Sequence, residues 1–352
     1  MKAMVLKRLC NLRDNLEPLK LIELPQPVPN DKELLLKVSA CGVCHTELDE
    51  IEGRISLVKL PLILGHQVIG RIKAIGSKVS SFNIGERVGV AWIFTACGIC
   101  KFCQSGRENL CSAFKATGCD ANGGYAEYMT VAEDFAYSIP MIFSDTQAAP
   151  LLCAGAIGYR SLELAGLKNG QRLGLTGFGA SGHLVLKMVK HQYPDIKVYV
   201  FSNNASERAF AKELGADWTG EIFEHAPHKL TSIIDTTPTW KPIVEALANL
   251  EAGGRLVINA IRKENDKTSL LLLDYATHLW QEKEIKTVTN ITRNDVKEFL
   301  KLSADMDIHP EIQVYALEQA NKALIELKTG VIHGAKVLNI NYANIKHFEP
   351  WK

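Results

Sequence analysis

Two groups of cysteine and histidine residues give this sequence its metal-binding potential. The first has the spacing C-x2-C-x2-C-x7-C and consists of Cys97, Cys100, Cys103 and Cys111. Four thiolates so spaced can surround one zinc ion tetrahedrally and leave no open position. An iron–sulfur cluster is the alternative, but in bacterial ferredoxins the fourth cysteine follows after three residues and precedes proline. Here Ser112 follows the fourth cysteine, so the spacing favours structural zinc.

The second group is dispersed along the chain and begins in ACGVCHTELDE, residues 40–50. Cys44, His66 in LGHQVIG and Cys153 in LLCAGA could supply two thiolates and one imidazole. Such a set leaves a fourth tetrahedral position for water or substrate, as a catalytic zinc requires. Taken singly, each of these residues is more often a core residue, so their positions alone do not group them.

A glycine-rich stretch, GFGASG, predicts a dinucleotide-binding loop. It follows an apolar strand and opens an amphipathic helix, which is the context that gives G-x-G-x-x-G its meaning. The first glycine permits the tight turn, the second lets the backbone approach a pyrophosphate, and the third lets helix and strand pack closely. The expected cofactor-binding residues are Gly177, Phe178, Gly179, Ala180, Ser181 and Gly182.

The end of the following strand bears on the choice of nucleotide. An acidic residue about 20 positions on would bind the ribose 2′-hydroxyl of NAD. Ser202, Asn203 and Asn204 stand there instead, and Arg208 follows. Without the acid a 2′-phosphate meets no repulsion, so we expect Ser202, Asn203 and Arg208 to favour NADP over NAD. Arg208 has an alternative interpretation as part of the solvated face of the next helix.

The pattern of strands and helices predicts two kinds of domain to position these residues. Residues 1–150 contain short strands broken by glycine, proline and asparagine, which predict a catalytic domain with an antiparallel barrel or irregular sheet. Over residues 151–290 strands alternate with helices, which predicts a doubly wound parallel sheet of the Rossmann type. Residues 291–352 are too few for a core of their own, and we expect them to return to the first domain.

Composition excludes several classes of function. The chain has 352 residues, is 47% hydrophobic and 22% charged, and has a net charge of +1, which gives no basic surface for nucleic acid or an anionic membrane. We see no signal peptide and no membrane-spanning stretch, so we expect a cytoplasmic protein with reduced thiols.

The motifs together resemble the zinc-dependent medium-chain alcohol dehydrogenases over essentially the whole chain. The resemblance is carried, in order, by CGVCHTEL, LPLILGHQ, the four-cysteine lobe, NGGYAEY, LLCAGAIGYRSL and GFGASGHL. It implies a GroES-like catalytic domain with a structural-zinc lobe at 95–113, an inserted Rossmann domain, and two zinc ions per chain. It also implies a homodimer or homotetramer acting on a small alcohol or aldehyde, without nucleic-acid or membrane partners.

The resemblance assigns roles by position. Cys44, His66 and Cys153 would hold the catalytic zinc, which acts as a Lewis acid on the alcohol. Thr46 would take the alcohol proton, with Asp49 or water receiving it next. Glu47 would orient His66. The positions near the ligands are His45 at the cofactor pyrophosphate and Ile55 and Trp92 in the substrate pocket, where Trp92 would restrict the slot to primary alcohols and aldehydes. Trp92 could instead be an ordinary core residue.

Some positions depart from the family pattern. Gln67, Asp49, Ile157 and Ala335 replace a glutamate, a histidine, a threonine and an arginine that are common there. They bear on cofactor affinity and rate, and no zinc ligand is lost. The alternatives are a cinnamyl-type NADPH aldehyde reductase and a catalytically silent NAD(P)-binding member of the family. A polyol dehydrogenase and a zinc-free quinone reductase are disfavoured by Cys153 and by the two metal sites.

Overall fold

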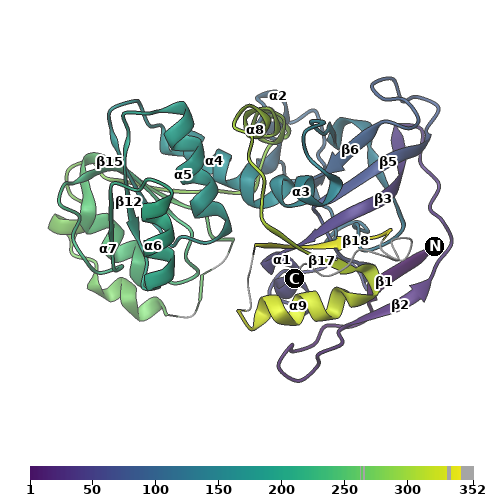
Figure 1. Ribbon diagram of the computed structural model, residues 1–352, viewed down its shortest axis with the longest axis horizontal. Coiled ribbons are helices and arrows are strands. Elements are labelled where there is room, and N and C mark those ends of the chain that lie inside the picture. The colour runs from purple at the N-terminus through teal and green to yellow at the C-terminus, as the bar shows by residue number, and fades with distance from the viewer. Residues whose placement is uncertain (262, 265, 331–333, 342–352) are drawn as a thin grey trace, which may run out of the picture. The chain divides into compact units, whose positions relative to one another are not determined.

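The computed structural model describes residues 1–261, 263–264, 266–330 and 334–341 and divides into two units (Figure 1). Unit 1 comprises Met1–Cys153 together with the described residues from Thr292 onward. Unit 2 is the continuous segment Ala154–Ile291. Unit 1 is therefore interrupted in sequence by unit 2.

The main sheet of unit 1 is built around the long strand β3 (Glu33–Val43). On one side β3 pairs antiparallel with β5 (Val68–Ile75), and on the other with β18 (Ala335–Asn339) and β9 (Tyr128–Ala132). The register of β3 against β5 shifts twice, between Leu35 and Leu36 and between Val38 and Ala40. Such bulges bend a strand. Figure 1 shows the yellow β18 beside the purple β3, so the C-terminal part of the chain completes this sheet.

The remaining elements of unit 1 surround that sheet. Its outer strands are β10 (Ala136–Ser138), β6 (Arg87–Val90) and β17 (Ile312–Ala316). Smaller sheets are formed by β1 (Lys2–Leu6), β2 (Leu19–Glu23) and β4 (Leu62–Ile63), and by β7 (Ile93–Thr95) and β8 (Lys115–Ala116). The α-helices are α1 (His45–Ile51), α2 (Lys101–Gln104), α3 (Asp145–Pro150), α8 (Arg293–Asp305) and α9 (Ala320–Lys328).

Unit 2 contains a six-stranded parallel sheet, which confirms the predicted doubly wound fold. Its strand order is β13 (Trp218–Gly220), β12 (Lys197–Phe201), β11 (Arg172–Thr176), β14 (Leu230–Asp235), β15 (Leu250–Ile258), β16 (Glu284–Thr287). The central strands β11 and β14 are buried along almost their whole length, as expected where helices cover both faces. The helices are α4 (Ala156–Ala165), α5 (Ala180–Gln192), α6 (Ala205–Glu213) and α7 (Lys241–Asn249).

Two expected helices of unit 2 are shorter than the sequence pattern suggested. The apolar pattern of KPIVEALANLEAGG, residues 241–254, predicts a helix over the whole stretch, but α7 ends at Asn249 because Leu250 already pairs with Leu230 in the sheet. The pattern of DYATHLWQEKE, residues 274–284, likewise predicts a helix, but the structure has only a π-helical turn there, Tyr275–Leu279. Gln281 and Glu282 have φ values of 70° and 59°, a left-handed conformation that ends a helix.

No helix in the described part of the chain is long and apolar enough to cross a membrane.

Candidate active site

Three dispersed side chains of unit 1 meet at one point. Cys44 is the N-cap residue of α1, His66 follows β4, and Cys153 lies in the π-helical turn Leu151–Gly155 after α3. The Sγ atoms of Cys44 and Cys153 are 3.9 Å apart, and His66 Nε2 is 3.4 Å from Cys153 Sγ. Their ligand atoms all lie within 4.8 Å of one another. Zinc–sulfur bonds of about 2.3 Å in a tetrahedron place two sulfurs about 3.8 Å apart. The donor set therefore fits a zinc ion with one open position.

Glu47 fixes the orientation of the His66 imidazole. Its Oε1 lies 2.6 Å from His66 Nδ1, and its Oε2 accepts the Cys44 N–H at 2.8 Å. Both side chains of the Glu47–His66 pair are essentially inaccessible to solvent. Because Glu47 occupies Nδ1, Nε2 is left to face the two thiols. A carboxylate behind a ligating histidine also raises its basicity.

The electrostatics of the cluster suit a cation. The pKa of Cys44 is lowered well below its usual value, chiefly by a hydrogen bond from Cys153. A thiolate is the form that ligates metal. One turn further along α1, Glu50 is fully buried, and neither of its carboxylate oxygens has a hydrogen-bond partner among the described residues. A divalent cation nearby would offset this buried negative charge.

The three remaining polar residues expected at the site have different surroundings. Thr46 is buried, and its Oγ1 is 3.6 Å from Cys44 Sγ. Asp49 is also buried, but its Oδ1 accepts a hydrogen bond from Arg54 Nε at 2.6 Å. Sequence reasoning did not identify this partner. His45 is exposed at the start of α1.

The two residues expected in the substrate pocket are both half-buried. The Trp92 ring centroid lies 6.0 Å from that of His66, so the indole is a direct neighbour of the ligand set. Ile55 donates its N–H to the Asp49 carbonyl at 3.3 Å, which attaches it to the end of α1. The structure thus places Trp92 beside His66, whereas it links Ile55 to the helix that carries Thr46.

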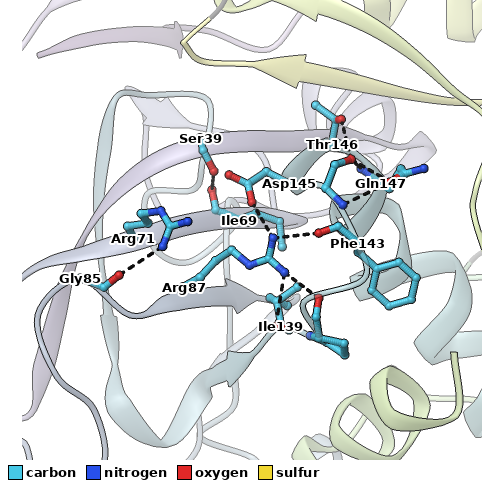
Figure 2. A network of polar contacts seen from close by, with 12 residues as sticks. Ser39, Ile69, Arg71, Gly85, Arg87, Ile139, Phe143, Asp145, Thr146 and Gln147 are labelled. Carbon is cyan, nitrogen blue, oxygen red and sulfur yellow. Dashed lines mark hydrogen bonds and ion pairs between the residues drawn. The ribbon is translucent and has the colours of Figure 1, made fainter. Parts of the chain in front are cut away.

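A network around Arg87 supports the segment that leads to Cys153 (Figure 2). The guanidinium reaches from β6 and donates to the carbonyl oxygens of Phe143 at 2.8 Å and Pro140 at 2.6 Å. It also pairs with Asp145 at 3.1 Å, at the first residue of α3. Since α3 runs directly into the turn that holds Cys153, Arg87 anchors the approach of the third ligand. Sequence reasoning did not single out this arginine.

The four-cysteine lobe forms a second cluster in unit 1. The Sγ atoms of Cys97 and Cys103 are 3.8 Å apart, and those of Cys100 and Cys103 are 3.6 Å apart. With Cys111, all four sulfurs lie within 4.8 Å of one another, so they fit a closed tetrahedral zinc site. Hydrogen bonds from backbone N–H groups, with the largest effect from Ile99, lower the pKa of Cys97 to about 6.

An ion pair joins this lobe to the C-terminal part of unit 1. Glu108 is buried, and its Oε1 accepts from the N–H of Arg293 at 2.8 Å and from Arg293 Nε at 3.0 Å. Arg293 is the first residue of α8. The lobe is thereby fixed to a helix nearly two hundred residues away in sequence.

The glycine-rich loop of unit 2 has the geometry of a phosphate cradle. Gly177 has a φ of 80°, and a Cβ there would lie 2.8 Å from Thr236 Oγ1. A Cβ on Gly182 would lie 2.9 Å from the Gly177 carbonyl oxygen, whereas one on Gly179 would meet nothing within 4 Å. Gly177 and Gly182 therefore allow tight packing, and Gly179 leaves space above the N-terminus of the 13-residue helix α5. Ala180 and Ser181 form the first turn of that helix, whose free N–H groups suit a pyrophosphate. The loop fits a dinucleotide.

Polar contacts link the residues that follow β12. Ser202 is buried and Asn203 is exposed. Arg208 Nη1 donates to the Ser202 carbonyl at 2.6 Å, and its Nη2 lies 3.7 Å from Glu221 Oε1. Glu207, which sequence reasoning did not single out, accepts from Ser202 Oγ at 2.6 Å.

The departures from the family pattern are structurally accommodated. Gln67 is buried and packs over Gly42, where any Cβ would clash with its amide. Ala335 is half-buried at the start of β18, and Ile157 is half-buried in α4. Lys336, next to Ala335, is buried, and its Nζ donates to Gln313, Tyr315 and Glu326. The Lys336 ammonium group is thus bound by side chains within unit 1.

Comparison with known proteins gives matches that extend over most of the chain. Residues 30–141 match the family model described as the alcohol dehydrogenase GroES-like domain. A probable alcohol dehydrogenase AdhA from Mycobacterium tuberculosis is 40% identical over 328 residues, covering 92% of this chain and 93% of that protein. An alcohol dehydrogenase from Geobacillus stearothermophilus is 31% identical over 334 residues, covering 92% and 97%.

Solved structures share the fold. A cobalt- and zinc-bound thermostable alcohol dehydrogenase from Pyrobaculum aerophilum superimposes with a TM-score of 0.84 at 24% identity, covering 96% of this chain and 99% of that one. The CAD from Helicobacter pylori complexed with NADP(H) gives 0.82 at 22% identity, covering 97% and 98%. The expected combination of a GroES-like domain with a Rossmann-type sheet is confirmed.

Proposed function

Because this chain belongs to the zinc-dependent medium-chain alcohol dehydrogenases and is an NAD(P)-dependent oxidoreductase of small alcohols and aldehydes, we propose that Cys44, His66 and Cys153 hold its catalytic zinc. The observation that carries the proposal is the convergence of their three ligand atoms around the Glu47-oriented imidazole. Cys97, Cys100, Cys103 and Cys111 would hold a second, structural zinc.

The side chains around the ligands would then position the substrate and move its proton. When bound, zinc supplies a Lewis acid at the substrate oxygen and the nicotinamide supplies the hydride acceptor or donor. The Thr46 hydroxyl, beside Cys44, would accept the hydroxyl proton of the alcohol and pass its own outward. Asp49, held by Arg54, or a water would receive that proton. Trp92, packed beside His66, would narrow the pocket to primary alcohols and aldehydes.

The proposal is tested by turnover and metal content measured together. We expect two zinc ions per chain and chelator-sensitive turnover of primary alcohols, followed by the absorbance of the reduced cofactor. Cys44→Ala should abolish turnover and lose one zinc while staying folded. Cys10→Ala, which changes a cysteine outside both groups, should keep its turnover and both zinc ions. Turnover that survives Cys44→Ala would refute the assignment. A preference for flat aromatic aldehydes with NADPH would favour the cinnamyl-type alternative.

The contacts at the end of β12 bear on the nucleotide preference. The missing acid at 202–204 and the presence of Arg208 predict NADP from the sequence. In the structure, however, Arg208 is engaged by the Ser202 carbonyl and faces Glu221, and Glu207 brings a carboxylate to Ser202. These contacts support NAD instead. They put the Glu207 carboxylate beside the end of β12, and they engage the Arg208 guanidinium that would otherwise bind a 2′-phosphate.

We further propose that the protein is a homo-oligomer, a dimer or tetramer, joined through unit 2. β16 is the edge strand of its sheet, and all four of its residues are exposed. Unpaired edges invite pairing with another strand, and exposed apolar side chains mark interfaces. The apolar residues exposed on and before this edge are Leu271, Leu272, Tyr275, Trp280 and Ile285. Sedimentation should show an oligomer that Ile285→Lys dissociates.

The proposed compartment is the cytoplasm. All nine cysteines are free, and six of them belong to the two metal clusters, which need reduced thiols.

A further inference from the structure

We infer that Glu207 is the carboxylate that recognises the adenosine ribose of the dinucleotide, and that it makes the site select NAD(H) over NADP(H). The inference rests on the proposed function, because it specifies which nucleotide serves that reaction. In most doubly wound folds that bind NAD, the acid stands at the end of the second strand. Here helix α6 would supply it, five residues after Ser202.

The position of Glu207 follows from its contacts with the two stretches that line a ribose site. Its Oε2 accepts from Ser202 Oγ at 2.6 Å, at the end of β12, and from the Phe178 N–H at 3.3 Å, within the glycine-rich loop. In this fold the adenosine ribose binds between those two stretches. The carboxylate thus bridges the loop that would hold the pyrophosphate and the strand end that would hold the ribose.

The Glu207 carboxylate has a second oxygen that could accept hydrogen bonds from a ligand. Both contacts use Oε2, and Oε1 has no partner among the residues that the structure describes. Glu207 is half-buried, so the residue as a whole is not enclosed by the protein. Asn204 caps α6 and Glu207 lies in its first turn, so the backbone that carries the carboxylate is itself fixed.

The chemistry of this arrangement separates the two nucleotides. The ribose of NAD offers two hydroxyl donors, and a carboxylate is an acceptor only. A 2′-phosphate replaces one donor by an anion, which a carboxylate a few ångströms away repels. Arg208, the nearest cation considered for that phosphate, already donates to the Ser202 carbonyl and lies 3.7 Å from Glu221. The charge that meets the ribose edge is therefore negative.

The test is the equilibrium binding of NADH and NADPH, measured by isothermal titration calorimetry on the intact protein. We expect the parent to bind NADH about tenfold or more tightly than NADPH. Glu207→Gln should lower this ratio of the two affinities about tenfold, mainly by raising the affinity for NADPH. Glutamine keeps the shape and one acceptor oxygen. The matched control is Glu213→Gln, which makes the same charge change at the exposed far end of α6 and should leave the ratio unchanged.

The outcomes distinguish this inference from the proposed function. Equal or tighter binding of NADPH by the parent overturns the inference alone, and so does an unchanged ratio in Glu207→Gln. A purely structural contact would lower the thermal midpoint of that variant without moving the ratio. If Glu207→Gln does not fold, Glu207→Ala, which removes the carboxylate altogether, must bring the affinities for NADH and NADPH closer together for the inference to stand. Failure of the parent to bind either nucleotide would overturn the proposed function as well.

Discussion

The Arg87 network allows a prediction in which stability and metal content change together. Arg87 has a side chain only 10% exposed and binds three carbonyl oxygens and the Asp145 carboxylate of the segment that leads into α3. Arg87→Met keeps the length of the side chain but removes every donor. Hydrogen bonds to charged groups are worth ~1.5–3 kcal/mol each, and breaking a buried pair costs ~3–5 kcal/mol in total. We expect a loss of about 4 kcal/mol, or a fall of about 10 °C in the thermal midpoint.

The metal content gives this prediction its specific signature. Because α3 continues into the turn that carries Cys153, loosening it should release the zinc held by Cys153 and spare the one in the four-cysteine lobe. Zinc analysis should therefore fall from two ions per chain towards one, with a matching loss of turnover.

The neighbouring strand supplies a matched control. Arg71 on β5 is exposed and donates one hydrogen bond, to the Gly85 carbonyl at 3.3 Å (Figure 2). Arg71→Met should change the unfolding free energy by less than about 0.5 kcal/mol and keep both zinc ions. If Arg87→Met behaved like Arg71→Met in thermal midpoint and zinc content, the anchoring role assigned to Arg87 would be refuted.

Three further outcomes are expected from the site. Cys103→Ser should lower the thermal midpoint and lose one zinc, because the lobe would have three thiolates left to close its site; an unchanged midpoint would contradict a structural zinc there. Glu47→Gln, which weakens the hold on His66 Nδ1, should lower zinc affinity or kcat about 10–100-fold while leaving the lobe zinc in place, as chelator competition would show. Trp92→Ala should raise kcat/KM for branched or bulky alcohols relative to ethanol, and a panel that keeps its ranking would remove Trp92 from the pocket.

The metal sites were predictable from sequence to different degrees. The lobe cysteines lie within fifteen residues of one another, so their spacing alone predicted a cluster. Cys44, His66 and Cys153 could be grouped only through the family resemblance, because their convergence depends on β3, on the turn after β4 and on α3. The structure brings all three together.

What the sequence could not indicate were the partners of charged side chains. No sequence motif marks these contacts, which are local or between strands. They are the hydrogen bonds of Arg54 to Asp49, of Arg87 to the segment before α3, and of Ser202 to Glu207. The alternation of strands and helices in unit 2 was predictable, since each strand is a short apolar run between turns. The end of α7 was not, because the pairing of Leu250 with Leu230 decides it.

The interruption of unit 1 by unit 2 has a consequence for biosynthesis. Unit 2 is one continuous segment, so every strand of its sheet has been made once the ribosome reaches Ile291. The sheet of unit 1 still lacks β18 and β17 at that moment, and β18 is the strand that pairs along β3 beside Cys44. Domains fold largely as units as they emerge during synthesis. The nucleotide-binding half can thus be finished first, and the zinc-binding half, though begun earlier, is the last part of the described chain to be completed.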